Sequence, residues 1–81
     1  MKLTRQYLYP VYDLSTEAET PEYLIYATGP IGALRTATML HIGEVPEDFL
    51  LRLFLGEVSL GYRDLAVSRT PVNGLLDWVN G

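Results

Sequence analysis

The sequence predicts an α+β fold, in which a small antiparallel sheet of three to four strands carries two short helices packed on one face. Large side chains recur at every second position in several segments, which is the period of a β-strand. Two later segments open with a proline that can occupy the first position of a helix, as is common at helix starts. Three of the strand segments precede the first helix, which indicates an antiparallel sheet with helices on one side. The 81 residues are expected to form a single compact domain, 1–81.

The first strand is expected close to the start of the chain, where every second residue has a large side chain: Leu3, Arg5, Tyr7, Tyr9 and Val11. Pro10 has no amide donor, so it places this strand at an edge of the sheet or ends it near Tyr9. Residues 13–21 are acidic and rich in hydroxyl groups and end in a proline, which is typical of a solvated loop.

The second and third strands are expected on either side of the stretch Gly29-Pro30-Ile31-Gly32. Residues 22–28 are aromatic and β-branched, which predicts a strand. Residues 33–42 are ambiguous, because apolar and polar residues alternate there while alanine, leucine and methionine also suit a helix. A strand is preferred, because the glycine stretch is then a four-residue hairpin loop.

Two helices are expected in the second half of the chain. Pro46 followed by Glu47 and Asp48 predicts a helix that runs through Leu55 and stops at Gly56. This helix is apolar on almost every side, so part of its surface needs a cover other than the sheet. In residues 57–69 apolar side chains recur at every second position, which predicts one bent strand or two short ones. Residues 70–79 have the apolar spacing of a short amphipathic helix.

The glycine stretch has a second interpretation, as a site for an anionic ligand. Glycines let backbone amides approach a phosphate, and a nearby cation adds positive potential. Gly29, Gly32 and Arg35 would then bind a small ligand or a nucleotide. Pro30 removes one amide donor, and neither a GKS/T ending nor a full GxGxxG pattern is present, so the hairpin is preferred.

The six tyrosines suggest a surface that binds another protein. Five of them lie on two strands that are expected to pair, and their spacing places rings on both faces of this hairpin. Only one face can point into a small core, so the other would display amphipathic rings of the kind enriched at interfaces. The residues predicted to bind a partner are Tyr7, Tyr9, Tyr12, Leu51 and Trp78. Alternatively, the rings close the edge of the core and keep their hydroxyls in water.

The charge of the chain argues against a direct nucleic-acid partner. Ten carboxylates and six basic residues give a net charge of −4, which is unfavourable for binding a phosphate backbone. The carboxylates form two clusters, residues 13–22 and 44–48, which are solvated surface or imitate a row of phosphates in an inhibitor of a nucleic-acid-handling enzyme. No uncharged run has the roughly 20 residues of a membrane-spanning helix, and the start does not resemble a signal peptide, so a cytoplasmic protein is expected.

The sequence gives no pattern typical of an enzyme, a metal site or a cofactor. His41 is the one histidine and there is no cysteine, so neither a cluster of histidines nor a thiolate site can form within the chain. A carboxylate-rich metal site stays open, but the carboxylates have no ligand spacing such as that of an EF-hand loop. No GxSxG motif orients a serine nucleophile. The preferred interpretation is a small protein-interaction module that acts without catalysis and forms a homodimer. The two alternatives are a ligand sensor built on the glycine stretch and an acidic inhibitor.

Overall fold

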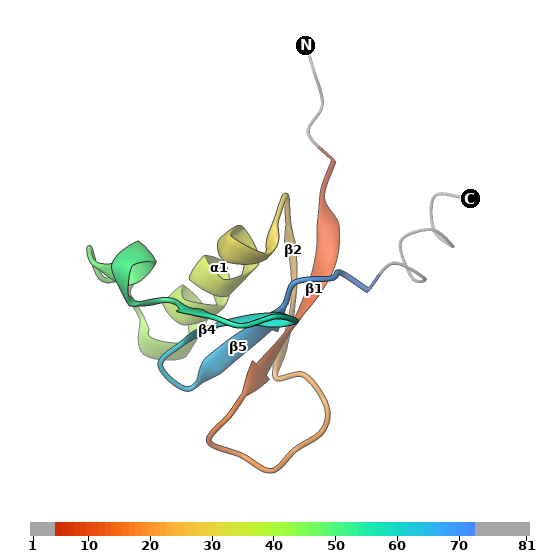
Figure 1. Ribbon diagram of the computed structural model, residues 1–81, viewed down its shortest axis with the longest axis horizontal. Coiled ribbons are helices and arrows are strands. Elements are labelled where there is room, and N and C mark those ends of the chain that lie inside the picture. Colours follow the sequence, from red (N-terminus) through yellow and green to blue (C-terminus); the bar gives the residue numbers. More distant parts are fainter. Residues whose placement is uncertain (1–4, 73–81) are drawn as a thin grey trace.

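The structure is a computed structural model that describes residues 5–72 (Figure 1). This part of the chain is an α+β fold with one antiparallel sheet of five strands, in the order β2-β1-β5-β4-β3. The strands are β1 (Tyr7–Asp13), β2 (Tyr23–Ala27), β3 (Phe54–Leu55), β4 (Ser59–Tyr62) and β5 (Leu65–Ser68). One α-helix, α1 (Pro30–Ile42), covers a face of the sheet, and a short 3₁₀ turn, η1 (Phe49–Arg52), follows it. The predicted fold class is therefore confirmed, although the strand and helix counts were wrong for the described residues.

Strand β1 lies inside the sheet, between β2 and β5, so the prediction that Pro10 marks an edge or an early end was wrong. The Leu8 carbonyl accepts a hydrogen bond from Val72 at 2.7 Å, and the Val11 carbonyl accepts one from Glu22 at 2.8 Å. Because backbone groups alternate along a strand, the Pro10 nitrogen faces the β5 side. The ladder with β5 begins only at Val11, so the missing N–H breaks no ladder bond.

Residues 33–42 belong to helix α1, so the prediction of a strand and of a hairpin at the glycine stretch was wrong. Gly29 is the N-cap of the helix and Pro30 occupies its first turn, where a missing amide costs nothing. Gly43 ends the helix with a left-handed φ of 83°, and its amide donates to the Met39 carbonyl at 2.9 Å. The buried residues recur with helical spacing rather than at every second position: Ala33, Leu34, Ala37 and Thr38.

The predicted helix over residues 46–55 is also wrong, because only η1 forms there before the chain extends into β3. Leu53 has ψ of 141°, which is incompatible with a helix and turns the chain into the sheet. Phe54 then pairs with Gly61 of β4, and a Cβ at Gly61 would lie 3.3 Å from the Phe54 ring. The apolar stretch therefore splits: Phe49 enters the core, whereas its neighbours stay on the surface.

Residues 57–69 were predicted to form one bent strand or two short ones, and the structure has the second arrangement: β4 and β5 pair through a two-residue turn at Arg63 and Asp64. Arg63 adopts a left-handed φ of 56°, and its guanidinium lies 5.5 Å from the Tyr62 ring centroid. The strand predicted over residues 22–28 is confirmed as β2. The helix predicted over residues 70–79 lies almost entirely outside the described residues, and residues 70–72 are not helical.

The core lies between α1 and the inner face of the sheet. Every second residue of the central strands points into it, including Val11, Leu65 and Val67, which are almost fully buried. Thr38 of α1 is buried as well, and its hydroxyl donates to the Leu34 carbonyl at 2.8 Å. Among the described residues, every buried side-chain nitrogen or oxygen has a hydrogen-bond partner. No helix in the described part of the chain is long and apolar enough to cross a membrane.

Candidate functional site

Four polar side chains that are distant in the sequence meet at one end of the sheet. Asp13 ends β1, Tyr23 begins β2, His41 lies in the last turn of α1, and Asp64 lies in the β4–β5 turn. His41 Nε2 is 3.5 Å from an Asp64 carboxylate oxygen, and His41 Nδ1 is 3.1 Å from the Tyr23 hydroxyl. One potential ligand atom from each of Asp13, His41 and Asp64 lies within 4.8 Å of the other two. We call these three residues the Asp13–His41–Asp64 cluster.

The backbone brings the two carboxylates of this cluster together. The Leu14 amide, directly after Asp13, donates to the Asp64 carbonyl at 2.6 Å and so ties the end of β1 to the β4–β5 turn. The Ser15 amide and hydroxyl both donate to Oδ1 of Asp13, at 2.9 Å and 2.6 Å. These two Ser15 hydrogen bonds, and to a smaller extent the nearby His41, lower the pKa of the Asp13 carboxyl below its usual value.

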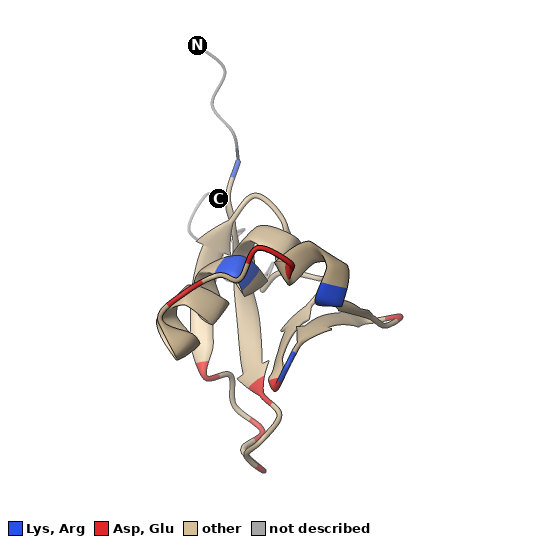
Figure 2. Cartoon of the chain, turned by 90° about the vertical axis from the view of Figure 1, so that its left-hand side faces the viewer, with Lys and Arg blue, Asp and Glu red and all other residues tan. Residues whose placement is uncertain are grey.

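The sequence did not predict this cluster, because its members have no fixed spacing along the chain. From the sequence, Asp13 belongs to a row of solvated carboxylates and His41 is a structural or surface histidine, while a carboxylate-rich metal site has no recognisable ligand spacing. In the structure Asp13 is half-buried and turned toward His41, whereas Glu17, Glu19 and Glu22 are exposed. Figure 2 shows the positions of Asp and Glu residues, in red, along the loop after β1 and at the strand ends beside it. Two aspartates could have pointed to the site: Asp13 at the end of a predicted strand and Asp64 in a tight turn.

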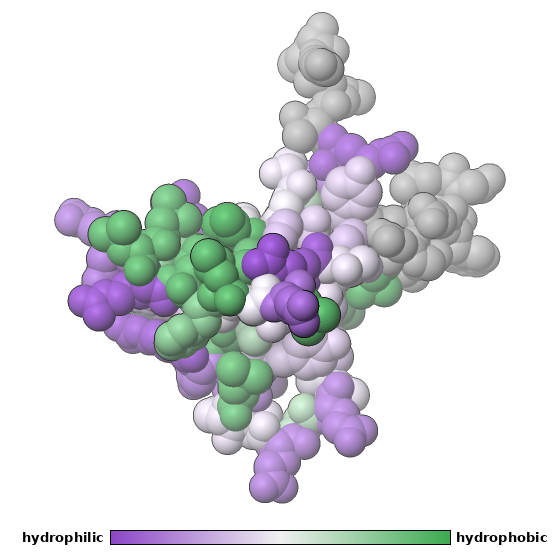
Figure 3. Space-filling model, in the orientation of Figure 1, coloured by the Kyte–Doolittle hydropathy of each residue, from purple (hydrophilic) through white to green (hydrophobic). Residues whose placement is uncertain are grey.

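A second candidate site is an apolar surface on η1 and β3. Five large apolar residues within nine positions have 64–87% of their surface exposed: Leu50, Leu51, Phe54, Leu55 and Val58. We call this set the η1–β3 surface. Figure 3 shows apolar side chains gathered over the side of the molecule that carries η1 in Figure 1. A groove of about 550 Å³ runs along it, with Leu51, Leu53, Phe54 and Tyr62 among its walls.

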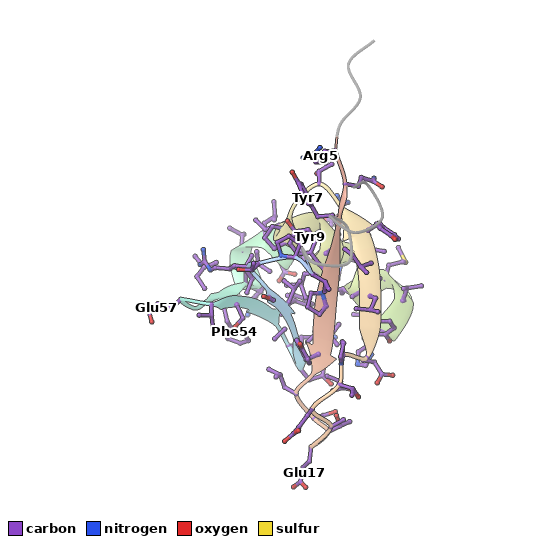
Figure 4. All side chains as sticks on the ribbon, turned by 90° about the vertical axis from the view of Figure 1, so that its right-hand side faces the viewer. Arg5, Tyr7, Tyr9, Glu17, Phe54 and Glu57 are labelled. Carbon is purple, nitrogen blue, oxygen red and sulfur yellow. The ribbon has the colours of Figure 1, made fainter. Side chains whose placement is uncertain are left out.

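Charges of both signs border the η1–β3 surface. Asp48 accepts a hydrogen bond from the Arg52 guanidinium at 3.0 Å, one helical turn away. Arg69 donates to the Gly56 carbonyl at 2.8 Å and lies near the hairpin that carries Glu57. Figure 4 places Phe54 and Glu57 on one side of the molecule and Glu17 at the tip of the acidic loop, away from them.

The residues predicted to bind a partner lie in different environments. Leu51 is 87% exposed and belongs to the η1–β3 surface. Tyr9 is only 4% exposed and lies in the core, so it offers no surface to a partner. Tyr7 packs against the core and Tyr12 is half-buried. Trp78 lies outside the described residues.

The residues predicted to bind an anion do not form a phosphate cradle. Gly29 and Gly32 lie in the first turn of α1, but Pro30 has no amide and the Ala33 amide is bonded to the Gly29 carbonyl at 3.2 Å. Arg35 lies on the exposed side of α1, one turn beyond Gly32, where both residues border a mostly apolar groove. Of the four positions at the helix start whose amides have no partner within the helix, Pro30 therefore contributes none.

Comparisons with protein-family models, with curated proteins and with solved structures found no match to this chain.

Proposed function

We propose that the chain is a small protein-interaction module that pairs with a second copy of itself through the η1–β3 surface. The observation that carries this proposal is the run of five exposed apolar side chains in and beside an edge strand. Residues of this kind are normally removed from water, and contiguous exposed patches of such size mark binding sites. The proposal explains why most of the apolar side chains in residues 49–55 are exposed on the surface rather than buried in the core.

The size of the η1–β3 surface suits a dimer. Side chains of these sizes and exposures present on the order of 600 Å² per copy, close to the roughly 800 Å² that each partner contributes to a standard interface. Burial of this apolar area, at about 25 cal/mol per Å², is the favourable contribution from which the entropy lost on association is subtracted. The groove beside Phe54 could accept a leucine from the partner.

A second copy is the partner that the local geometry favours. Strand β3 pairs with β4 on one side and has no strand on its other side within the described sheet. Two β3 edges can meet antiparallel about a two-fold axis, which makes the interface self-complementary. Charges of both signs border this surface, since Arg52 pairs with Asp48 and Arg69 donates to the Gly56 carbonyl next to Glu57, so two copies do not meet here through negative charge alone.

Sedimentation velocity at micromolar concentration tests the proposal. We expect the wild type to be a dimer and Leu51→Glu to raise the dissociation constant at least tenfold, because a buried charge at the interface has no partner (about 1.4 kcal/mol or more). Leu14→Glu is the matched control, since Leu14 is 61% exposed in the loop after β1 and lies outside the η1–β3 surface. A wild type that stays monomeric, or an equal effect of both substitutions, would contradict the proposal.

A further inference from the structure

We infer that the Asp13–His41–Asp64 cluster is a binding site for a divalent transition-metal cation of the zinc type. This inference is independent of the η1–β3 surface, because it rests on other residues and on another chemistry. The site combines one imidazole with two carboxylates, contributed by α1, the end of β1 and the β4–β5 turn. Three protein ligands with a fourth position left for water are a common arrangement around zinc.

The ligand types favour a transition metal over calcium or magnesium. Ca²⁺ and Mg²⁺ prefer sites made entirely of oxygen atoms, and Mg²⁺ retains several of its waters. An imidazole nitrogen suits Zn²⁺ and its neighbours in the first transition series. His41 is therefore the residue that sets the preference, while Asp13 and Asp64 supply the negative charge that a dication needs.

The distances fit coordination better than direct hydrogen bonding. His41 Nε2 lies 3.5 Å from Asp64 Oδ2, beyond the roughly 2.7–3.2 Å of an N–H···O hydrogen bond. Around a tetrahedral zinc with bonds of about 2.0–2.2 Å, two ligand atoms are separated by roughly 3.3–3.6 Å. His41 and Asp64 thus already have the spacing of two zinc ligands. The third ligand atom, from Asp13, is within 4.8 Å of both and needs only a small side-chain movement.

Neighbouring groups orient the ligands as they do in metal sites. A histidine that binds a metal through one ring nitrogen usually donates the other N–H to a fixed acceptor. The Tyr23 hydroxyl is 3.1 Å from His41 Nδ1 and meets this requirement when it accepts from Nδ1–H, which leaves the Nε2 lone pair directed at the carboxylates. Ser15 holds Oδ1 of Asp13 with two hydrogen bonds, which fixes the orientation of this carboxylate.

The charge at the site also favours a cation. Within residues 5–72, the ion pairs are those of His41 with Asp64 and of Arg52 with Asp48, so no lysine or arginine neutralises the Asp13 and Asp64 carboxylates. Arg63 is adjacent to Asp64 in the chain, but its guanidinium lies over the Tyr62 ring. The competing explanation is a purely structural contact between these carboxylates and a protonated His41. The two explanations differ in their response to metal.

Calorimetric titration of the chelator-treated full chain with ZnCl₂ provides the test, followed by thermal unfolding with and without Zn²⁺. We expect one Zn²⁺ per chain, a higher Tm with Zn²⁺ because the ligand binds the folded state, and at least tenfold weaker binding of MgCl₂. His41→Gln and Asp64→Asn should each lower zinc affinity at least tenfold. Glu19→Gln is the control, since Glu19 is an exposed carboxylate in the loop after β1, outside both the cluster and the η1–β3 surface, and it should bind zinc like the wild type.

Two further measurements keep the result decisive if a ligand variant fails to fold. Tyr23→Phe retains the ring and all three ligands, and it should weaken zinc binding about 10- to 100-fold by removing the acceptor for Nδ1–H. In nitrogen-15 NMR of the wild type, zinc should shift the His41 Nε2 resonance and leave Nδ1 protonated. No zinc binding at 100 μM, equal binding by every variant, or an unchanged His41 spectrum at saturating zinc would overturn the inference.

Discussion

Among single residues, Tyr9 shows how burial changes the chemistry of a side chain. Its ring lies in the core between β1 and α1, and this burial, together with the neighbouring Tyr7, raises the pKa of the Tyr9 hydroxyl above its usual value. The sequence pattern placed the same ring at a partner interface. Alternation identifies which tyrosines share a face of the strand, but it does not tell which of the two faces α1 covers.

The raised pKa of Tyr9 predicts a specific loss of stability at alkaline pH. Folding favours the protonated phenol, so the free energy of unfolding is unaffected well below pH 10 and falls as the pH rises above about 10, where the unfolded chain ionises first. We expect Tyr9→Phe to lessen this fall, as measured by urea unfolding between pH 7 and pH 11. Tyr26→Phe, which removes the hydroxyl of an exposed ring, should follow the wild type. Identical pH profiles for Tyr9→Phe and wild type would contradict the assignment.

Among the elements, helix α1 depends on its two terminal glycines in different ways. Gly29 has extended backbone angles at the N-cap, whereas Gly43 has a left-handed φ of 83° at the C-terminus. Neither position has a neighbour within 4 Å of an added Cβ, so space does not distinguish them. Backbone conformation alone should therefore separate their tolerance to alanine.

Gly43→Ala is expected to lower the free energy of unfolding by about 1 kcal/mol, because a left-handed residue with a Cβ is strained. Gly29→Ala should change it by less than about 0.5 kcal/mol, because extended backbone is open to alanine and the reduced freedom of the unfolded chain offsets a weaker cap. Urea unfolding at neutral pH measures both values. Equal losses at the two sites would show that the αL geometry of Gly43 is not what ends the helix.

The same elements show how far the sequence determines the fold. Strands β2, β4 and β5 were predicted because each has a consistent local pattern between turn residues. Residues 33–42 contain both a two-residue and a helical period, and only packing of Ala33, Ala37 and Thr38 on the sheet selects the helix. Residues 49–55 are apolar at almost every position, so they show neither a helical nor a strand period. Phe54 pairs with Gly61, whose lack of a side chain leaves room for the Phe54 ring. The Asp13–His41–Asp64 cluster forms only when β1, α1 and the β4–β5 turn are packed together, so no local sequence pattern predicts it.

At the scale of the whole molecule, apolar and acidic surfaces are separated. The η1–β3 surface is mainly apolar and has charges of both signs at its border, while the loop after β1 carries exposed carboxylates and no basic residue. An interface on the η1–β3 surface is stabilised mainly by apolar burial, whereas binding by the acidic loop would depend on electrostatic attraction. Salt screens electrostatic attraction over about 10 Å at 0.1 M and has little effect on apolar burial.

We therefore expect the dimer dissociation constant to change less than about threefold between 0.05 and 0.5 M NaCl. Glu17→Gln/Glu19→Gln, which removes two carboxylates from the acidic loop, should leave this constant unchanged. Sedimentation velocity at three salt concentrations measures both effects. A steep salt dependence that disappears in the double variant would instead support the alternative of an acidic inhibitor, above all if DNA then competes for the same partner.

The sheet order has a consequence for how the chain folds. Strand β1 is the first strand in the sequence, yet its inner neighbour β5 is the last, with Val11 opposite Val67. During synthesis β1 and β2 can form a hairpin early, but the central pairing waits until residue 68 has been made. Such long-range closure slows folding and makes it all-or-none. A nascent chain that stops before β4 has half a sheet under α1 and leaves one side of β1 unpaired.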